Sequence, residues 1–283
     1  MVKKISQILG SILALLALIL LVLNRSKSSL EQEFKKDQEK CFKHSHRPVL
    51  ERFQENQFKD YPRPIQNYIK QSGWVNQPLM EGMHLFFEGV QFKLGPGKPT
   101  IKMNYKITES ARSPRRIAYI DGSLFALKFN GYDALLPHKV TMKGELLNHF
   151  SLFQHSNDDL LAGSLLSYLS EVFLMPAALL NQKIHFQALN DHKVLARIKQ
   201  EDMELSGCFI FNDKAEMTCF ITDDRPFMDM EGQIKTYRWK AECFDYRANA
   251  DGIKLPNRLK ASWLIDGKYF DYFDGKISWL TYF

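Results

Sequence analysis

The stretch from Ser156 to Leu180 constrains this chain most, because it is long, mostly apolar and contains a proline near its end. Its beginning is typical of a helix start, since Ser156 and Asp159 have the spacing of a capping box. Beyond this point the apolar side chains fall on nearly all sides of a helix, which is typical of a buried helix. Pro176 ends the pattern, because proline disfavours the helical conformation in the residue before it. We therefore predict a buried helix over residues 158–175.

The rest of the body shows the two-residue period of β-strands. Val90, Phe92 and Leu94 alternate with polar residues, and residues 101–107 do the same. This alternation is typical of antiparallel strands with one wet face. Further strands are expected at 116–120, 123–129, 140–152, 184–188, 194–200, 203–211, 216–222, 237–246, 258–264, 269–274 and 276–282. Many short strands and one long buried helix predict an α+β fold, in which a strongly curved, half-barrel-like antiparallel sheet wraps around the helix.

The N-terminus contains a segment without a charge, residues 5–23, preceded by Lys3 and Lys4. At about 1.5 Å per residue its length just spans a hydrocarbon core of about 30 Å. A cleaved signal peptide is the alternative, but the small-x-small site after it is only Ser26-x-Ser28. The sequence therefore predicts a retained single-pass transmembrane anchor at 1–24, a polar stalk at 25–60 and a single domain at 61–283. We expect the body to lie outside the cytoplasm, since the lysines favour an N-terminus inside.

The formal net charge of +6 comes mainly from the N-terminal region. Residues 1–47 contain 9 Lys and Arg and 4 Asp and Glu. The remaining residues therefore contain 29 Lys and Arg and 28 Asp and Glu. A nearly neutral body gives no support for nucleic-acid binding, which needs a basic face on the domain itself.

Glu171 is the residue that the sequence singles out for chemistry, because it is a carboxylate on the predicted buried helix. Such a group needs a partner, for which Arg225 is the first choice and Arg116 the second. One interpretation is an internal ion pair that fixes the helix in the sheet, and the other is a ligand-binding site. The candidate ligand-binding residues are Glu171, Arg225, Arg116, Asp133 and Trp239.

Other chemistries lack a signature in this sequence. Ser164 and Ser167 share a helical stripe with Glu171, but there is no Gly-x-Ser-x-Gly elbow, so no catalytic residue is predicted. The eight histidines show no H-x-x-x-H or H-E-x-x-H spacing, so we predict no metal site and no cofactor. Cys208 and Cys219 flank a predicted hairpin turn. A two-residue loop places them directly opposite one another, within disulfide reach, whereas a three-residue loop places them on opposite faces of the sheet.

Several stretches together resemble a widespread bacterial family of membrane-anchored proteins of unknown function. The resemblance covers about residues 61–283 and rests on the opening Tyr61-Pro-x-Pro-Ile-Gln-x-Tyr and on the helix Tyr168-Leu-Ser-Glu-Val-Phe-Leu-Met-Pro. These stretches match the family patterns L-P-x-P-V-x-x-Y and Y-L-A-E-x-x-x-x-P. Ser170 stands where the family has alanine, and Ala215 where glycine is usual. The C-terminal pattern is also similar to that of periplasmic lipoprotein-carrier proteins, half-barrels that hold acyl chains between a curved sheet and helices.

These observations favour a non-enzymatic, membrane-anchored binding module for a hydrophobic or lipid-like ligand. The physical reason for this interpretation is that a concave sheet rich in phenylalanine and methionine, next to lipid, suits an apolar ligand. Two alternatives remain open: an enzyme that uses Glu171 with Arg225 or Asp133, and a structural or interaction protein whose core is filled. The expected partners are the membrane, through the N-terminal helix, and a possible hydrophobic ligand.

Overall fold

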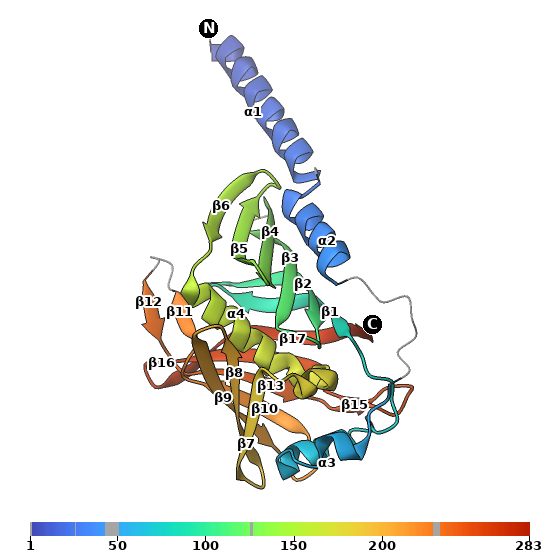
Figure 1. The fold of residues 1–283 in the computed structure, drawn as a ribbon. Helices are drawn as coiled ribbons and strands as arrows, with labels where there is room; N and C mark the ends of the chain where they lie inside the picture. Colours follow the sequence, from blue (N-terminus) through green and yellow to red (C-terminus); the bar gives the residue numbers. More distant parts are fainter. Residues whose placement is uncertain (1, 26, 43–50, 125–126, 229–232) are drawn as a thin grey trace.

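The computed structural model describes residues 2–25, 27–42, 51–124, 127–228 and 233–283 (Figure 1). Within these ranges, thirteen strands form one open antiparallel sheet. In spatial order the strands are β6 (Phe150–His155), β5 (Lys139–Leu146), β4 (Leu127–Leu136), β3 (Arg115–Leu124), β2 (Thr100–Ser110), β1 (Gly82–Lys93), β17 (Lys268–Tyr282), β16 (Arg258–Ile265), β13 (Trp239–Phe244), β10 (Met217–Thr222), β9 (Met203–Phe211), β8 (Lys193–Gln200) and β7 (Ile184–Asn190). The α+β fold with an antiparallel sheet is thus confirmed.

The order of the strands explains why one helix lies at the centre. The chain builds the sheet outward from β1 to the edge strand β6, then restarts at the opposite edge with β7 and returns to the middle with β17. Helix α4 (Asp158–Glu171) and two 3₁₀ turns, η2 (Val172–Leu174) and η3 (Pro176–Leu180), form the connection between the two edges. This connection has to cross one face of the sheet, and Figure 1 shows α4 in front of the strands.

Helix α4 begins and ends close to the predicted positions, with two differences. Its N-cap is Asn157, whose side chain accepts a hydrogen bond from the Leu160 amide at 2.9 Å, and not Ser156. The α-helix ends at Glu171. Of the remaining residues expected to be helical, Val172–Leu174 form the 3₁₀ turn η2 and Met175 is its C-cap. Pro176 then starts η3, where its fixed φ suits the first turn.

The main core lies between α4 and the sheet. Leu165, Leu166, Tyr168 and Leu169 of α4 are all fully buried. Past the end of α4, the ring of Phe173 packs edge-on against Phe209 of β9, with 4.7 Å between the ring centroids. Burial of this many apolar side chains on one element is the main stabilising contribution to the position of the helix.

Tyrosine hydroxyl groups satisfy backbone carbonyls beyond the end of α4, where the intrahelical bonds stop. Tyr68 of α3 (Arg63–Gln71) donates to the Phe173 carbonyl at 2.6 Å, and Tyr282 of β17 donates to Leu174 at 2.7 Å. Tyr61 donates to the Leu179 carbonyl at 2.9 Å. These bonds hold η2 and η3 against β17, α3 and the residues just before α3.

Helix α2 (Ser29–Cys41) covers the other face of the sheet, within the region expected to be a polar stalk. Its Leu30 and Phe34 form a second apolar cluster with side chains of β3 and β4, including Tyr119 and Tyr132. Lys139 binds both Glu33 and Asp37 of α2, with the Glu33 contact at 2.8 Å. Further along, Phe53 and Phe58 of this region are buried in the main core.

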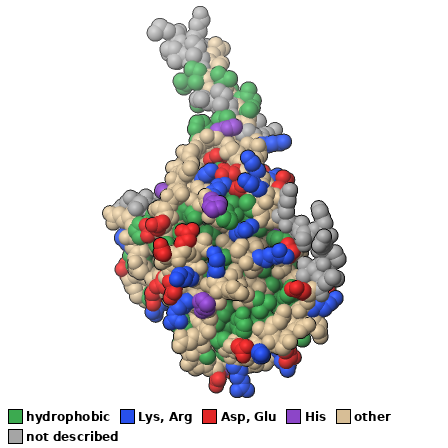
Figure 2. Space-filling model, viewed as in Figure 1, with side chains coloured by type: hydrophobic (Ala, Val, Ile, Leu, Met, Phe, Trp, Pro, Cys, Tyr) green, Lys and Arg blue, Asp and Glu red, His purple; other side chains and the backbone are tan. Residues whose placement is uncertain are grey.

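Residues 2–25 form helix α1, which projects away from the sheet (Figure 1). Across the described ranges, no helix combines the length and the apolar character needed to cross a membrane, so the expected transmembrane anchor at 1–24 is not supported. Figure 2 shows acidic and basic side chains interspersed over the visible face of the body, as expected from its small net charge.

Some strand boundaries differ from the expected ones for local reasons. The segment 140–152 is two strands, because Leu147 and Asn148 have positive φ and form a turn. The segment 123–129 spans the end of β3 and the start of β4, and residues 125–126 lie outside the described ranges. In contrast, 269–282 is one strand, β17, that continues through Asp274-Gly275. A Cβ at Gly275 would lie 3.0 Å from the ring of Phe87, so glycine serves close packing here and not a turn.

The hairpin between β9 and β10 corrects both expectations for its cysteines. Its loop is residues 213–215, with Ala215 at a φ of 56°, and a bulge follows between Met217 and Cys219. Cys208 therefore pairs with Ile221, and Cys219 pairs with Ile210. Because residues two apart on a strand share a face, both thiols lie on one face but diagonally, and both are free.

Candidate functional site

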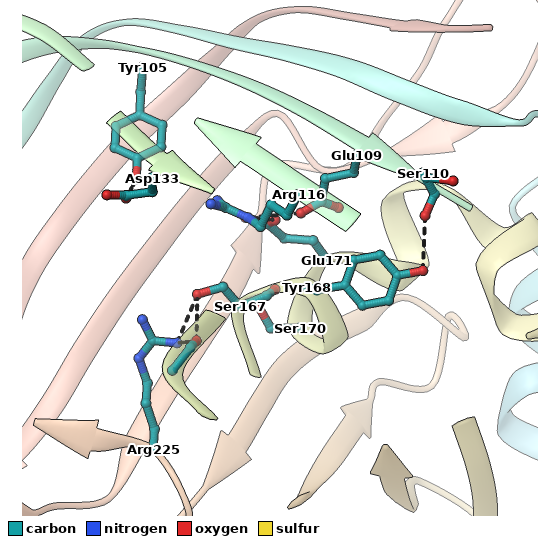
Figure 3. A network of polar contacts seen from close by, with 11 residues as sticks. Tyr105, Glu109, Ser110, Arg116, Asp133, Ser167, Tyr168, Ser170, Glu171 and Arg225 are labelled. Carbon is teal, nitrogen blue, oxygen red and sulfur yellow. Dashed lines mark hydrogen bonds and ion pairs between the residues drawn. The ribbon is translucent and has the colours of Figure 1, made fainter. Parts of the chain in front are cut away.

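A cluster of buried ionisable side chains lies where the end of α4 meets β2, β3 and β4 (Figure 3). Glu171 is the last residue of α4, and Arg116 lies on β3. The Arg116 guanidinium binds the Glu171 carboxylate in a bidentate manner, with Nε to Oε2 at 2.9 Å and Nη2 to Oε1 at 3.2 Å. Glu171 thus has an arginine partner, as the sequence predicts, but it is the second choice, Arg116, and not Arg225.

Glu109 is a third member of this cluster and is fully buried. It lies opposite Arg116 in the β2–β3 ladder, and its Oε1 is 2.8 Å from Arg116 Nε. The Nε hydrogen is directed to Glu171, so the contact with Glu109 is electrostatic, and neither Glu109 oxygen has a hydrogen-bond partner among the described residues. Burial and the neighbouring Glu171 charge raise the pKa of Glu109 well above its usual range.

The surroundings shift the pKa values of the two carboxyl groups of the cluster in opposite directions. Burial alone would raise the pKa of Glu171, but the Arg116 charge and hydrogen bonds outweigh it and lower that pKa. The ionised form is thus favoured at Glu171 and the protonated form at Glu109, with Arg116 between them. The sequence missed Glu109 because the predicted strand 101–107 stopped two residues before it.

Arg225 lies immediately before β11 (Pro226–Met228). It contacts α4 at a different point from Arg116. Its Nη1 donates to the Gly163 carbonyl and to Ser167 Oγ, the latter at 2.8 Å. Its guanidinium lies over the Trp239 ring at 4.6 Å from the centroid. Arg225 thus forms hydrogen bonds to Gly163 and Ser167, which lie one turn apart on α4. It acts on Glu171, one turn further along, only as a nearby charge. Burial lowers the pKa of Arg225.

Asp133 and Trp239 join the same region from two strands. Tyr105 of β2 donates its hydroxyl hydrogen to Asp133 Oδ2 at 3.3 Å, and burial raises the pKa of Asp133. Trp239 is the first residue of β13 and donates from Nε1 to the Tyr272 hydroxyl at 3.1 Å. The fold thus brings all five predicted site residues close to α4, although it pairs them differently.

A cavity of about 100 Å³ lies between α4 and the sheet, next to this cluster. Its polar and charged lining residues are Arg116, Ser167, Ser170, Glu171 and Glu242. The remaining lining is aromatic, aliphatic or strand backbone, and includes Phe87, Phe92, Tyr105, Ile107, Leu174, Trp239, Ala241, Cys243, Leu259, Tyr272 and Phe273. A water molecule occupies about 30 Å³ in the liquid, so the space would hold about three.

The serines of the cavity do not resemble nucleophiles. Ser167 Oγ donates back to the Gly163 carbonyl at 3.0 Å, and Ser170 Oγ donates back to the Ser167 carbonyl at 2.8 Å. Such bonds are the common state of serine within a helix. In the part of the chain that the structure describes, no group of three His, Cys, Asp or Glu side chains is arranged to hold a metal ion.

A larger, more open hollow of about 730 Å³ lies at the other end of β2, β3 and β4. It is lined mainly by polar residues, among them Asn24, Lys102, Asn104, Asp121 and Lys128. Its charged residues, Lys102, Asp121 and Lys128, are exposed or partly exposed. The smaller cavity under α4, which combines apolar walls with buried charges, is therefore the candidate site.

Comparison with curated proteins found no match. Two solved structures show limited similarity. One is a domain from Vibrio parahaemolyticus assigned as an outer membrane lipoprotein-sorting protein, with 10% identity, a TM-score of 0.29, and coverage of 71% of this chain and 85% of that chain. The other is a DUF1329 family protein from Desulfovibrio piger, with 9% identity, a TM-score of 0.32, and coverage of 77% and 91%.

A family model, described as a family of unknown function (DUF6544), matches residues 51–275. This range includes α4, nearly the whole sheet and every residue that lines the cavity. The chain therefore belongs to the family of unknown function DUF6544.

Proposed function

We propose that this chain is a non-enzymatic binding module for a hydrophobic or lipid-like ligand, with the cavity under α4 as its binding site. The observation that supports the proposal is the cavity itself, which has apolar and aromatic walls and buried charged groups at one place. Binding sites for small molecules commonly combine such walls with a few polar groups that fix the orientation of the ligand.

The free energy of an empty space supports the same proposal. Protein interiors are packed as densely as organic crystals, and a void of this kind costs stability. At about 24 cal/mol per Å³, a cavity of about 100 Å³ costs about 2 kcal/mol. Ala241 lines the cavity, so substituting it by a larger apolar residue would fill part of the space.

The size of the cavity limits what it takes. Sites for drug-sized ligands measure about 300–1,000 Å³, whereas this one measures about 100 Å³. The space suits a short alkyl segment or one small ring. A lipid-like ligand would therefore insert only one end here, with the remainder outside the cavity.

The enzyme alternative gains no support from the geometry. Glu171 is occupied by Arg116, and Arg225 forms hydrogen bonds to α4 without contacting Glu171. Asp133 accepts a hydrogen bond from Tyr105. None of these acids is poised beside a nucleophile, as general acid or base catalysis requires.

The location outside the cytoplasm stays a prediction from the N-terminal charges.

Mass spectrometry of small molecules that co-purify with the protein tests the proposal. The wild-type protein is expected to carry an apolar or amphiphilic compound, and Ala241→Leu, which adds three carbon atoms to the cavity wall, is expected to carry less. Ala248→Leu on the exposed strand β14 (Arg247–Ala248) makes the same change away from the cavity and should carry the wild-type amount. Equal amounts in all three proteins, or none in the wild type together with no binding of hexan-1-ol, contradict the proposal.

A further inference from the structure

Arg225 is in a position that is unfavourable for a cation. Its guanidinium lies over Trp239 at 4.6 Å and near Trp263 at 5.9 Å, and its Nε is buried without a hydrogen-bond partner. The groups that it does contact, the Gly163 carbonyl and the Ser167 hydroxyl, are both neutral. Buried charged groups in proteins are normally paired with an opposite charge.

The second arginine at the site shows the contrast. Arg116 binds the Glu171 carboxylate with two hydrogen bonds. Among the residues that the structure describes, no carboxylate lies within 4.0 Å of the Arg225 guanidinium. Aromatic rings stabilise a cation only in part, and Glu171 acts on Arg225 as a nearby charge without a hydrogen bond. Among the described residues, Arg225 therefore has no directly paired counter-ion.

The guanidinium does not line the cavity itself, but it contacts two residues that do. Ser167, its hydrogen-bond partner, and Trp239, the ring beneath it, both line that space. Figure 3 shows Arg225 approaching Ser167 from one side of α4, while Arg116 approaches Glu171 from the other. A polar head group on the Ser167 and Trp239 side of the cavity would be next to the two residues that contact Arg225.

We infer that the ligand is an amphiphile with an anionic head group, a carboxylate or a phosphate, and that Arg225 binds this head group. The inference rests on the proposed function, since it places the ligand in the same cavity. The planar fork of a guanidinium matches both oxyanions, and the free Nε provides a donor for them.

The test is a titration of the full chain with four probes, followed by calorimetry and by tryptophan fluorescence. The probes are hexanoate, hexyl phosphate, hexan-1-ol and inorganic phosphate. The two anionic amphiphiles are expected to bind roughly tenfold or more tightly than hexan-1-ol, because a hydrogen bond to a charged group adds that much affinity. Inorganic phosphate lacks the apolar chain and is expected to bind much more weakly than hexyl phosphate.

Variants assign the effect to one side chain. Arg225→Gln is expected to remove the preference for the anionic probes and to leave hexan-1-ol binding unchanged. Arg225→Lys keeps the charge without the fork and should retain part of the preference. Arg238→Gln is the matched control, because Arg238 binds Asp223 on the exposed surface nearby, and it should behave like the wild type.

Each other outcome has a distinct meaning. Hexan-1-ol that binds as tightly as hexanoate overturns the anionic head group but leaves the proposed function standing. Absence of binding by all three chain-bearing probes overturns the proposed function itself. Inorganic phosphate that binds as tightly as hexyl phosphate shows a site for free anions and overturns the amphiphile. If Arg225→Gln does not fold, an Arg225→Lys protein with no change in the preference overturns the role of Arg225.

Discussion

Arg116 Nε lies 2.9 Å from Glu171 Oε2 and 2.8 Å from Glu109 Oε1, so one buried cation lies between two carboxyl groups. The three residues come from β3, the end of α4 and β2. Only Glu171 receives hydrogen bonds from the guanidinium, through both Nε and Nη2. The two glutamates therefore have different roles, and their substitutions are expected to have different effects.

Glu171→Gln is expected to lower the free energy of unfolding by about 3 kcal/mol or more, because it leaves Arg116 buried without its counter-charge. Urea unfolding at pH 7 measures this change. The double variant Glu171→Gln with Arg116→Met removes the isolated charge and should recover part of the loss. A single variant as stable as the wild type would show that the ion pair does not hold α4 in the sheet.

Glu109→Gln is expected to cost less than about 1.5 kcal/mol at pH 7, although Glu109 is more deeply buried than Glu171. The reason is that burial and the Glu171 charge favour the neutral form of Glu109, and glutamine has nearly the same shape as a protonated glutamate. Comparison with Glu171→Gln in the same unfolding experiment checks which of the two glutamates carries the negative charge. A loss as large as that of Glu171→Gln would mean that Glu109 carries the charge.

The pH dependence of stability follows from the raised pKa of Glu109, which faces Arg116 and Glu171 with Tyr168 nearby. In the folded state Glu109 keeps its proton at pH values where the unfolded glutamate, with a pKa of 4.5, has lost it. Its contribution to stability is therefore complete below pH 4.5 and decreases as the pH rises towards the folded pKa. Glu171, whose pKa is lowered, has the opposite sign, and its contribution is lost as the pH falls below 4.5.

Unfolding free energies of the wild type and of Glu109→Gln, measured from pH 4 to pH 9, separate the two contributions. The unfolding free energy of the wild type minus that of the variant should decrease as the pH rises, with a slope of at most about 1.4 kcal/mol per pH unit. A difference that is constant over this range contradicts a raised pKa at Glu109.

The features of this fold that could be predicted from the sequence are those with local causes. The position of α4 follows from an apolar pattern that begins at an N-capping residue and ends before Pro176. Most strands follow from a period of two. The predicted break between residues 274 and 276 was wrong for a tertiary reason. Asp274-Gly275 is a typical turn sequence, but here the glycine lets Phe87 pack closely against the strand.

The partners within the site could not be predicted, because they depend on the order of strands in the sheet. Arg116 and Arg225 are chemically equivalent candidates for Glu171. The choice between them depends on β3 meeting the C-terminal end of α4, while Arg225 meets Gly163 and Ser167 on earlier turns. Glu109 enters the site only through the register of the β2–β3 ladder, which pairs it with Arg116.

A chain that begins at Tyr61 is expected to be much less stable than one that begins at Glu51, although both lack α2. Residues 51–60 supply Phe53 and Phe58, which are 0% and 1% exposed in the main core. Phe53 also exchanges backbone hydrogen bonds with the segment before β1, from its amide to Gln77 and from Asn76 to its carbonyl, both at 2.9 Å.

Loss of one buried phenylalanine side chain costs about 3–5 kcal/mol, so loss of both is comparable to the total stability of an ordinary domain, about 5–15 kcal/mol. Urea midpoints of the two shortened chains measure the effect, with the full chain as the reference. Equal midpoints would place the boundary of the independently folding body at Tyr61. A cooperative transition for the chain from Glu51, and its absence or a large shift for the chain from Tyr61, would show that the body includes the two phenylalanines.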